Sequence, residues 1–183
     1  TSAILLNDDS FAGSGGQGTA RILAAAIKQQ DASIALFGKR SIDGDTGMTP
    51  IMVARALGWT PLTYVSAIKS IDGDTITVER TLEQGVQTVS AELPVVISVV
   101  KEINEPRYPS FMGIRKANRA KIPVLTAADL DIDGAVGADS SKVDWSAITM
   151  PPARVTETEM ITGDSPAEIA EQLADRLMAE KVI

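Results

Sequence analysis

The sequence predicts an α/β fold in which a parallel-core sheet has helices on both faces. In the first sixty residues, short apolar runs typical of buried strands alternate with helical patterns, an order that favours parallel strands. Alanine, valine, isoleucine and leucine are plentiful, whereas aromatic residues make up only 4% of the chain. With 183 residues, 44% of them hydrophobic, the chain can bury a core.

Local signals place these first elements along the chain. The second helix has the clearest ends, because Thr49 can cap its start, Pro50 suits its first position and Gly58 stops it. We predict strands at residues 3–6 and 33–38 and helices at residues 19–29 and 50–57.

From residue 62 to residue 100 the apolar period becomes two, which is typical of strands with one buried face. The turns Asp72-Gly73-Asp74 and Glu83-Gln84-Gly85 divide this stretch and predict antiparallel hairpins. The continuous apolar run at residues 93–100 predicts a central strand.

The remainder of the chain holds one well-signalled helix. It begins with Ser165 as N-cap, Pro166 at the first position and Glu168 completing a capping box. Its apolar stripe contains Ile169, Leu173 and Leu177. Before it, residues 129–164 lack periodicity and predict an extended C-terminal arm that wraps a partner or serves a function.

The composition excludes several kinds of chemistry. The chain has no histidine and no cysteine, so it has no imidazole base, thiol nucleophile or iron–sulfur ligand. Any redox chemistry must therefore belong to a bound cofactor, and we predict no catalytic residues. The net charge of −7 argues against nucleic acid as a partner, and no apolar run is long enough for membrane insertion. We expect a soluble, cytoplasmic protein.

Two motifs resemble ligand sites. Residues 13–18 match G-x-G-x-x-G before a predicted helix. Three interpretations remain open: a dinucleotide fingerprint, another kind of phosphate contact, or a flexible turn. Residues 129–134 match the start of a calcium loop, but Ser140 stands where a bidentate glutamate belongs. We interpret residues 129–134 as a solvated acidic turn and predict no metal site.

The most informative loop follows the second predicted strand. Open α/β sheets bind ligands at the carboxyl ends of their strands, and the following helix start offers free N–H groups to phosphate. Glycines 38, 44 and 47 allow close approach to a ligand. A well-capped turn without a ligand is the alternative. The candidate ligand-binding residues are Gly38, Lys39, Arg40, Ser41, Ile42, Asp43, Gly44, Asp45, Thr46, Gly47, Met48 and Thr49.

A second candidate is the arm at residues 104–122. Between Arg107 and Lys121 it has five basic residues and no acidic one, in an otherwise acidic chain. Ser110 can cap a short helix that carries apolar side chains, which would anchor a partner while the charges steer it. An ordinary solvated helix is the alternative. The candidate docking residues are Arg107, Tyr108, Phe111, Met112, Ile114, Arg115 and Lys116.

These segments resemble the electron-transfer flavoprotein β-subunit family. The specific block is Asn-Glu-Pro-Arg-Tyr-Pro at residues 104–109, and Gly38-Lys39 with residues 42–46 is similar to the family's nucleotide loop. Further similar segments lie in the family's order at residues 11–13, 78–80, 93–94, 99–102, 114, 116–117 and 121–122. The chain differs from the common pattern at Gly15, Gly16, Met48 and Pro50.

The resemblance implies a Rossmann-like fold of the adenine nucleotide alpha hydrolase type. It implies a non-catalytic electron carrier, paired with an α subunit that holds most of the FAD. The loop at residues 38–49 would bind AMP, or a second FAD in electron-bifurcating members. Phe111 would anchor an acyl-CoA dehydrogenase or related flavoprotein dehydrogenase, as in fatty acid oxidation, and a eukaryotic location would be the mitochondrial matrix. A nucleotide-binding sensor or scaffold without electron transfer is the alternative.

Together these expectations divide the chain in two. Residues 1–128 form an α/β nucleotide-binding domain that includes the arm at residues 104–122. Because the family pattern has a further strand–helix–strand portion before Thr1, we expect this domain to be incomplete at its N-terminus. Residues 129–183 form an extended segment whose terminal helix packs on the partner subunit or on its own core.

Overall fold

The structure is a computed structural model that describes residues 2–143, 146–153, 155–156 and 158–182. The chain forms two compact units, residues 1–144 and residues 145–183. Among the described residues, none of the helices has the length and apolar character needed to cross a membrane.

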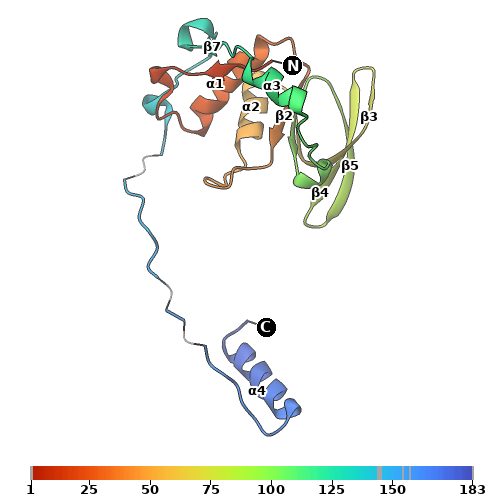
Figure 1. Cartoon of the computed structure of the whole chain (residues 1–183), viewed down its shortest axis with the longest axis vertical. Helices are drawn as coiled ribbons and strands as arrows, with labels where there is room; N and C mark the ends of the chain where they lie inside the picture. Colours follow the sequence, from red (N-terminus) through yellow and green to blue (C-terminus); the bar gives the residue numbers. More distant parts are fainter. Residues whose placement is uncertain (1, 144–145, 154, 157, 183) are drawn as a thin grey trace. The chain divides into compact units, whose positions relative to one another are not determined.

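A mixed five-stranded sheet organises the first unit (Figure 1). Its strand order is β2-β6-β3-β4-β5. Strand β6 pairs in parallel with both β2 and β3, whereas β3, β4 and β5 form antiparallel hairpins. The strands are β2 (Ile34–Gly38), β3 (Thr60–Asp72), β4 (Thr75–Leu82), β5 (Gly85–Glu92) and β6 (Val95–Val99). The predicted central strand and hairpins are therefore confirmed.

Strand β6 is buried on both faces, because Val95, Val96 and Ile97 are each at most 1% exposed. On one face, Val96 packs with α1 (Gly16–Lys28) and α2 (Thr49–Leu57). On the other face, Val95 and Ile97 pack with β3 and β4 and with Ile103 of the short helix η2 (Lys101–Ile103). The predicted α/β class, with a parallel core and helices on both sides of the sheet, is confirmed.

A smaller layer covers the outer side of α1. It contains a two-stranded parallel sheet of β1 (Leu5–Leu6) and β7 (Val124–Leu125) and the short helices η1 (Asp9–Phe11), η3 (Ala127–Asp129) and η4 (Ala138–Ser140). Leu130 packs there with Ile22 and Ala25 of α1. The Asp8 carboxylate joins distant segments by accepting the N–H groups of Ser10 and Ala127 at 2.9 Å each. A hydrogen bond from the Ser10 side chain, together with these two backbone bonds, lowers the Asp8 pKa.

One helix cap differs from the prediction. Helix α2 ends at Gly58 in the left-handed conformation, as predicted. Its N-cap, however, is Met48, and Thr49 already lies inside the helix without a side-chain capping bond. Met48 has helical backbone angles, so the turn enters the helix one residue earlier than the Thr49-Pro50 signal indicates.

The glycine-rich motif at residues 13–18 packs against another part of the chain. A Cβ at Gly13 would lie 3.0 Å from the Ala138 side chain, and a Cβ at Gly18 would lie 2.5 Å from Ser140 Oγ. The Gly137 N–H donates to Ser14 Oγ at 2.7 Å. These glycines therefore let helix η4 approach the start of α1, which begins at Gly16 rather than at Thr19.

The second unit contains helix α4 (Pro166–Ala179). Ser165 caps it by accepting the Glu168 N–H at 3.3 Å, as predicted. The Glu168 carboxylate does not close the capping box on Ser165, but accepts the N–H of the preceding Asp164 at 2.9 Å. Arg176 pairs with Glu159 at 2.6 Å and joins the helix to the segment before it.

The glycine packing predicts different effects for two similar substitutions. Gly18→Ala should destabilise the protein by about 1–3 kcal/mol, because the new methyl group meets Ser140 and Ser14 in a closely packed contact. Gly16→Ala is the matched control, since its methyl group meets only the flexible Met52 side chain, at 3.0 Å. Urea denaturation followed by circular dichroism measures both. A Gly18→Ala midpoint at or above that of Gly16→Ala would contradict the packing argument.

Candidate functional site

Two loops meet at the carboxyl ends of the parallel strands β2 and β6. One loop begins at Gly38 and the other at Val100, and both border a cavity of about 920 Å³. Gly38, Lys39 and Arg40 contribute one side of this cavity, and residues 99–104 with Pro106 contribute another. Because ligands of open α/β sheets bind outside the carboxyl ends of parallel strands, this strand-end cavity is the expected place for one.

A second cavity, of about 570 Å³, lies next to the first and shares Lys39, Arg40 and Thr81 with it. Its other walls are Tyr64 of β3 and the turn between β4 and β5. Lys39 Nζ lies 5.1 Å from the centroid of the Tyr64 ring, a distance at which the cation and the ring attract each other. Lys39 and Arg40, the two cationic residues of the loop after β2, therefore border both cavities.

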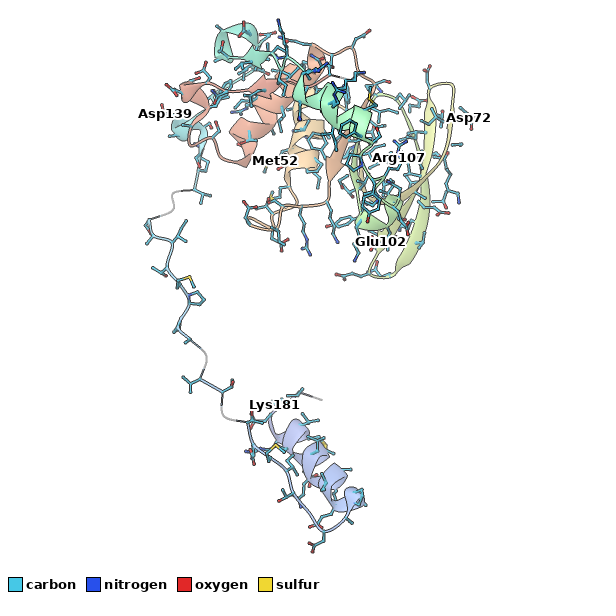
Figure 2. The ribbon with its side chains drawn as sticks, in the orientation of Figure 1. Met52, Asp72, Glu102, Arg107, Asp139 and Lys181 are labelled. Carbon is cyan, nitrogen blue, oxygen red and sulfur yellow. The ribbon has the colours of Figure 1, made fainter. Side chains whose placement is uncertain are left out.

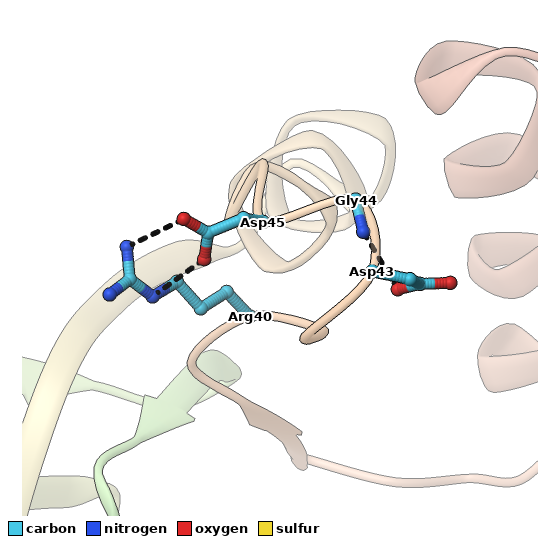
Figure 3. A network of polar contacts seen from close by, with 4 residues as sticks. All are labelled: Arg40, Asp43, Gly44 and Asp45. Carbon is cyan, nitrogen blue, oxygen red and sulfur yellow. Dashed lines mark hydrogen bonds and ion pairs between the residues drawn. The ribbon is translucent and has the colours of Figure 1, made fainter. Parts of the chain in front are cut away.

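The loop after Lys39 is held by its own polar contacts (Figure 3). The Arg40 guanidinium binds the Asp45 carboxylate through two contacts, at 2.9 and 3.2 Å. Hydrogen bonds from Ser41 and from the Gly44 N–H hold the pKa of Asp43 below its ordinary value. The carboxylates of Asp43 and Asp45 thus shape the loop, and the Asp45 carboxylate neutralises the Arg40 charge.

The structure brings together only part of the predicted ligand loop. Gly38, Lys39 and Arg40 line the strand-end cavity, whereas residues 41–49 do not line either cavity described here. Ile42 is fully exposed, and Gly47 turns the chain into α2 with a φ of 61°. The start of α2 still presents backbone N–H groups that no side chain caps.

The charges around the strand-end cavity favour an anionic ligand at Lys39. Its neighbour Arg40 is already paired with Asp45, and Lys101 lies 3.9 Å from the Glu102 carboxylate. Both pairs are largely exposed, so each contributes little to stability and can rearrange around a ligand. Lys39 is the cation that can reach either cavity without breaking an ion pair in the described part of the chain.

Three contributors to this site were missed by sequence reasoning. The sequence pattern places Tyr64 and Thr81 in the predicted hairpin strands and ends the central strand at Val100. It marks none of these residues, nor residues 101–103, as part of a ligand site. They are distant in sequence from the loop at Gly38, and only the sheet order brings them beside Lys39. The apolar run ending at Val100 was the available signal, because it marks a second parallel strand whose end adjoins the first.

The arm forms the exposed helix that the sequence predicts. Helix α3 (Phe111–Asn118) begins at Ser110, whose Oγ accepts the Gly113 N–H at 3.1 Å. Every residue from 104 to 124 is exposed, and Phe111 and Met112 retain 72% and 69% of their accessible surface. Large apolar side chains so exposed on one short helix are typical of an interaction surface.

The docking candidates share this exposed surface. The Arg115 guanidinium lies 6.0 Å from the centroid of the Phe111 ring, one helical turn away. Arg107, which is labelled in Figure 2, and Tyr108 precede the helix in a segment without regular secondary structure. Tyr108 is 99% exposed. The arm therefore presents apolar and positively charged side chains together.

The acidic turn at residues 129–134 does not gather its carboxylates. Asp129 accepts the N–H and the hydroxyl of Thr126 at 2.8 and 2.7 Å, which lowers the Asp129 pKa. Asp131 and Asp133 instead border a small cavity with Arg21 and Lys28. Within the described residues, no group of three acidic side chains is arranged to hold a metal ion.

Comparisons with known proteins identify the family. The family model described as electron transfer flavoprotein domain matches residues 1–130. The chain is 37% identical to the electron transfer flavoprotein subunit beta of Megasphaera elsdenii over 190 residues, 99% of this chain and 70% of that protein. It is also 37% identical to the same subunit of Thermoanaerobacterium thermosaccharolyticum, with 99% and 69% covered.

A third relative is named as part of a larger complex. The caffeyl-CoA reductase-Etf complex subunit CarD of Acetobacterium woodii is 34% identical, over 99% of this chain and 69% of that protein. All three relatives align along nearly the whole chain, including the loop at Gly38 and the arm. The chain therefore belongs to the family of electron transfer flavoprotein β subunits.

Proposed function

We propose that this chain is the β subunit of a heterodimeric electron-transfer flavoprotein that carries electrons between flavoprotein dehydrogenases and a downstream acceptor. The observation that carries the proposal is the exposed, basic helix that begins at Phe111, in a chain of this family. Asn104 and Pro106 of the same arm line the strand-end cavity. We propose a cytoplasmic location, and a dehydrogenase of the acyl-CoA dehydrogenase type as electron donor.

The strand-end cavity fits an adenine nucleotide. Its volume of about 920 Å³ is within the range of small-molecule sites, and its polar groups come from both loops. Lys39 supplies a positive charge, and the side chain of Asn104 and the hydroxyl of Thr81 supply hydrogen-bonding groups for a ribose or a base. We propose AMP, or the adenylate half of a second FAD, as the ligand.

The redox chemistry of the pair comes from FAD, which we propose to be held mainly by the α subunit. The residues of this chain act by binding and orienting. Lys39 would hold a phosphate in the strand-end cavity that it lines. We assign no acid, base or nucleophile to the chain, so its contribution to electron transfer is the distance and orientation at which partners meet.

Docking would use the arm as a small anchored surface. Phe111 is the largest apolar side chain on α3, and its exposure lets it enter a pocket without unfolding the helix. Arg115 lies beside the Phe111 ring, and Arg107 and Lys116 are on the same arm. Their positive charge would steer an acidic dehydrogenase surface and make the association rate sensitive to salt.

The nucleotide proposal predicts the effect of removing one charge. Lys39→Met in the complex with the α subunit should weaken AMP binding about tenfold, because one cation–phosphate contact is lost. Lys69→Met is the matched control, since Lys69 pairs with Glu79 and borders neither of the two cavities. Bound nucleotide is released by denaturation and quantified by chromatography for each complex. Equal nucleotide content in the Lys39→Met and Lys69→Met complexes would refute the assignment of Lys39.

The docking proposal predicts a loss of electron transfer without a loss of assembly. Phe111→Ala should slow reduction by the partner dehydrogenase about tenfold or more, as expected for an anchoring aromatic side chain. The α and β subunits should still co-elute in gel filtration. Val86→Ala, on β5, is the control because Val86 is similarly exposed, at 64%. If Phe111→Ala transfers electrons as fast as Val86→Ala, the arm is not the docking element.

A further inference from the structure

Tyr64 has a backbone conformation that is unusual for an aromatic residue. Its φ of 58° lies in the left-handed region, although the residue is inside strand β3. A bulky residue adopts this conformation only where its surroundings impose it, and such residues cluster at functional sites.

A β-bulge produces this conformation. In the pairing of β3 with β6, Leu62 lies opposite Ile97 and Val65 lies opposite Val99. Between these two pairs β3 advances by three residues and β6 by two, so β3 has one extra residue. The extra residue breaks the alternation of inward and outward side chains. Bulges of this kind redirect a side chain, and here the redirected side chain is Tyr64.

Polar contacts fix the bulge from two neighbouring strands. The Tyr64 N–H donates to Ser98 Oγ of β6 at 3.2 Å, and Ser98 is only 4% exposed. From β4, Arg80 donates through Nε to the Thr63 carbonyl at 2.7 Å and through a second guanidinium nitrogen to Thr63 Oγ1 at 2.8 Å. Both residues of the bulge are thus held in place by groups that do not line either cavity.

Tyr64 lines the 570 Å³ cavity together with residues 82–84. It keeps 40% of its surface exposed, and Lys39 Nζ is the cation above its ring. The same Lys39 borders the strand-end cavity, so its flexible side chain can follow a phosphate there and uncover the ring. A phosphate site and an aromatic face are therefore within reach of one lysine.

We propose that Tyr64 is the platform on which a planar heteroaromatic ring of the bound nucleotide or flavin stacks, and that Arg80 and Ser98 are its positioning residues. This inference rests on the proposed function, because it takes the ligand to be AMP or FAD. Adenine and isoalloxazine share the flat π-face that stacks on an aromatic side chain. The cavity volume is sufficient for either ring.

The experiment uses the complex with the α subunit after its adenine nucleotide has been exchanged out, and titrates AMP and FAD separately by calorimetry. Tyr64→Phe retains the ring and should bind both probes within about twofold of wild type. Tyr64→Gly removes the ring but suits the positive φ, so the urea midpoint should not fall. If isoalloxazine is the ring that stacks on Tyr64, the affinity of Tyr64→Gly should fall about tenfold for FAD alone. If adenine is the ring that stacks, the affinity should fall about tenfold for both probes.

Three outcomes would overturn the inference. If wild type binds both probes and Tyr64→Gly binds them with unchanged affinity, Tyr64 is not a stacking platform, and the proposed function is unaffected. If Tyr64→Gly loses α/β assembly but keeps its ligand affinity, Tyr64 belongs to the subunit interface and not to the ligand site. A wild-type complex that binds neither AMP nor FAD overturns this inference together with the nucleotide proposal.

Arg80 has its own test as a positioning residue. Arg80→Lys keeps the charge but loses the two-pronged contact with Thr63. It should weaken ligand binding when Tyr64 is present and have no further effect in the Tyr64→Gly background. Equal weakening in both backgrounds would show that Arg80 does not act through Tyr64.

Discussion

The parallel pairing of β6 with β2 and β3 is the constraint on which the rest of the first unit depends. Val95, Val96 and Ile97 are buried on both faces, so β6 cannot shift by one residue without exposing or crowding a core cluster. This fixed register places the ends of β2 and β6 side by side. The strand-end cavity follows from it, since the two loops leave the sheet at the same edge.

The same sheet carries a local exception that gives the site its second wall. Regular pairing of β3 would continue the alternation through Thr63, Tyr64 and Val65, whereas the bulge keeps Leu62 and Val65 in the core and turns Tyr64 outward. Two polar side chains that are partly or fully buried bind backbone groups at the bulge: Ser98 accepts from the Tyr64 N–H, and Arg80 donates to the Thr63 carbonyl. The Tyr64 N–H and the Thr63 carbonyl therefore keep hydrogen-bond partners despite the irregularity.

Local chemistry explains what the sequence could predict. Gly58, Ser110 and Ser165 each end or begin a helix through contacts within a few residues, so their roles are visible in the sequence. The cap at Met48 and the strained Tyr64 depend on how the chain packs, and neither residue type signals its conformation. For the same reason the loop at Gly38 was found, but its companions Tyr64 and Thr81 were not.

The glycines at residues 13–18 show why a motif needs its context. In a dinucleotide fingerprint such glycines leave room for a pyrophosphate. Here the space above Gly13 and Gly18 is filled by Ala138 and Ser140, and the Gly137 N–H is bound by Ser14. A phosphate could not occupy that space without displacing η4, whereas Gly38 has no atom within 4 Å of its added Cβ. Steric access thus separates residues 13–18 from the loop at Gly38, and it favours the loop as the ligand site.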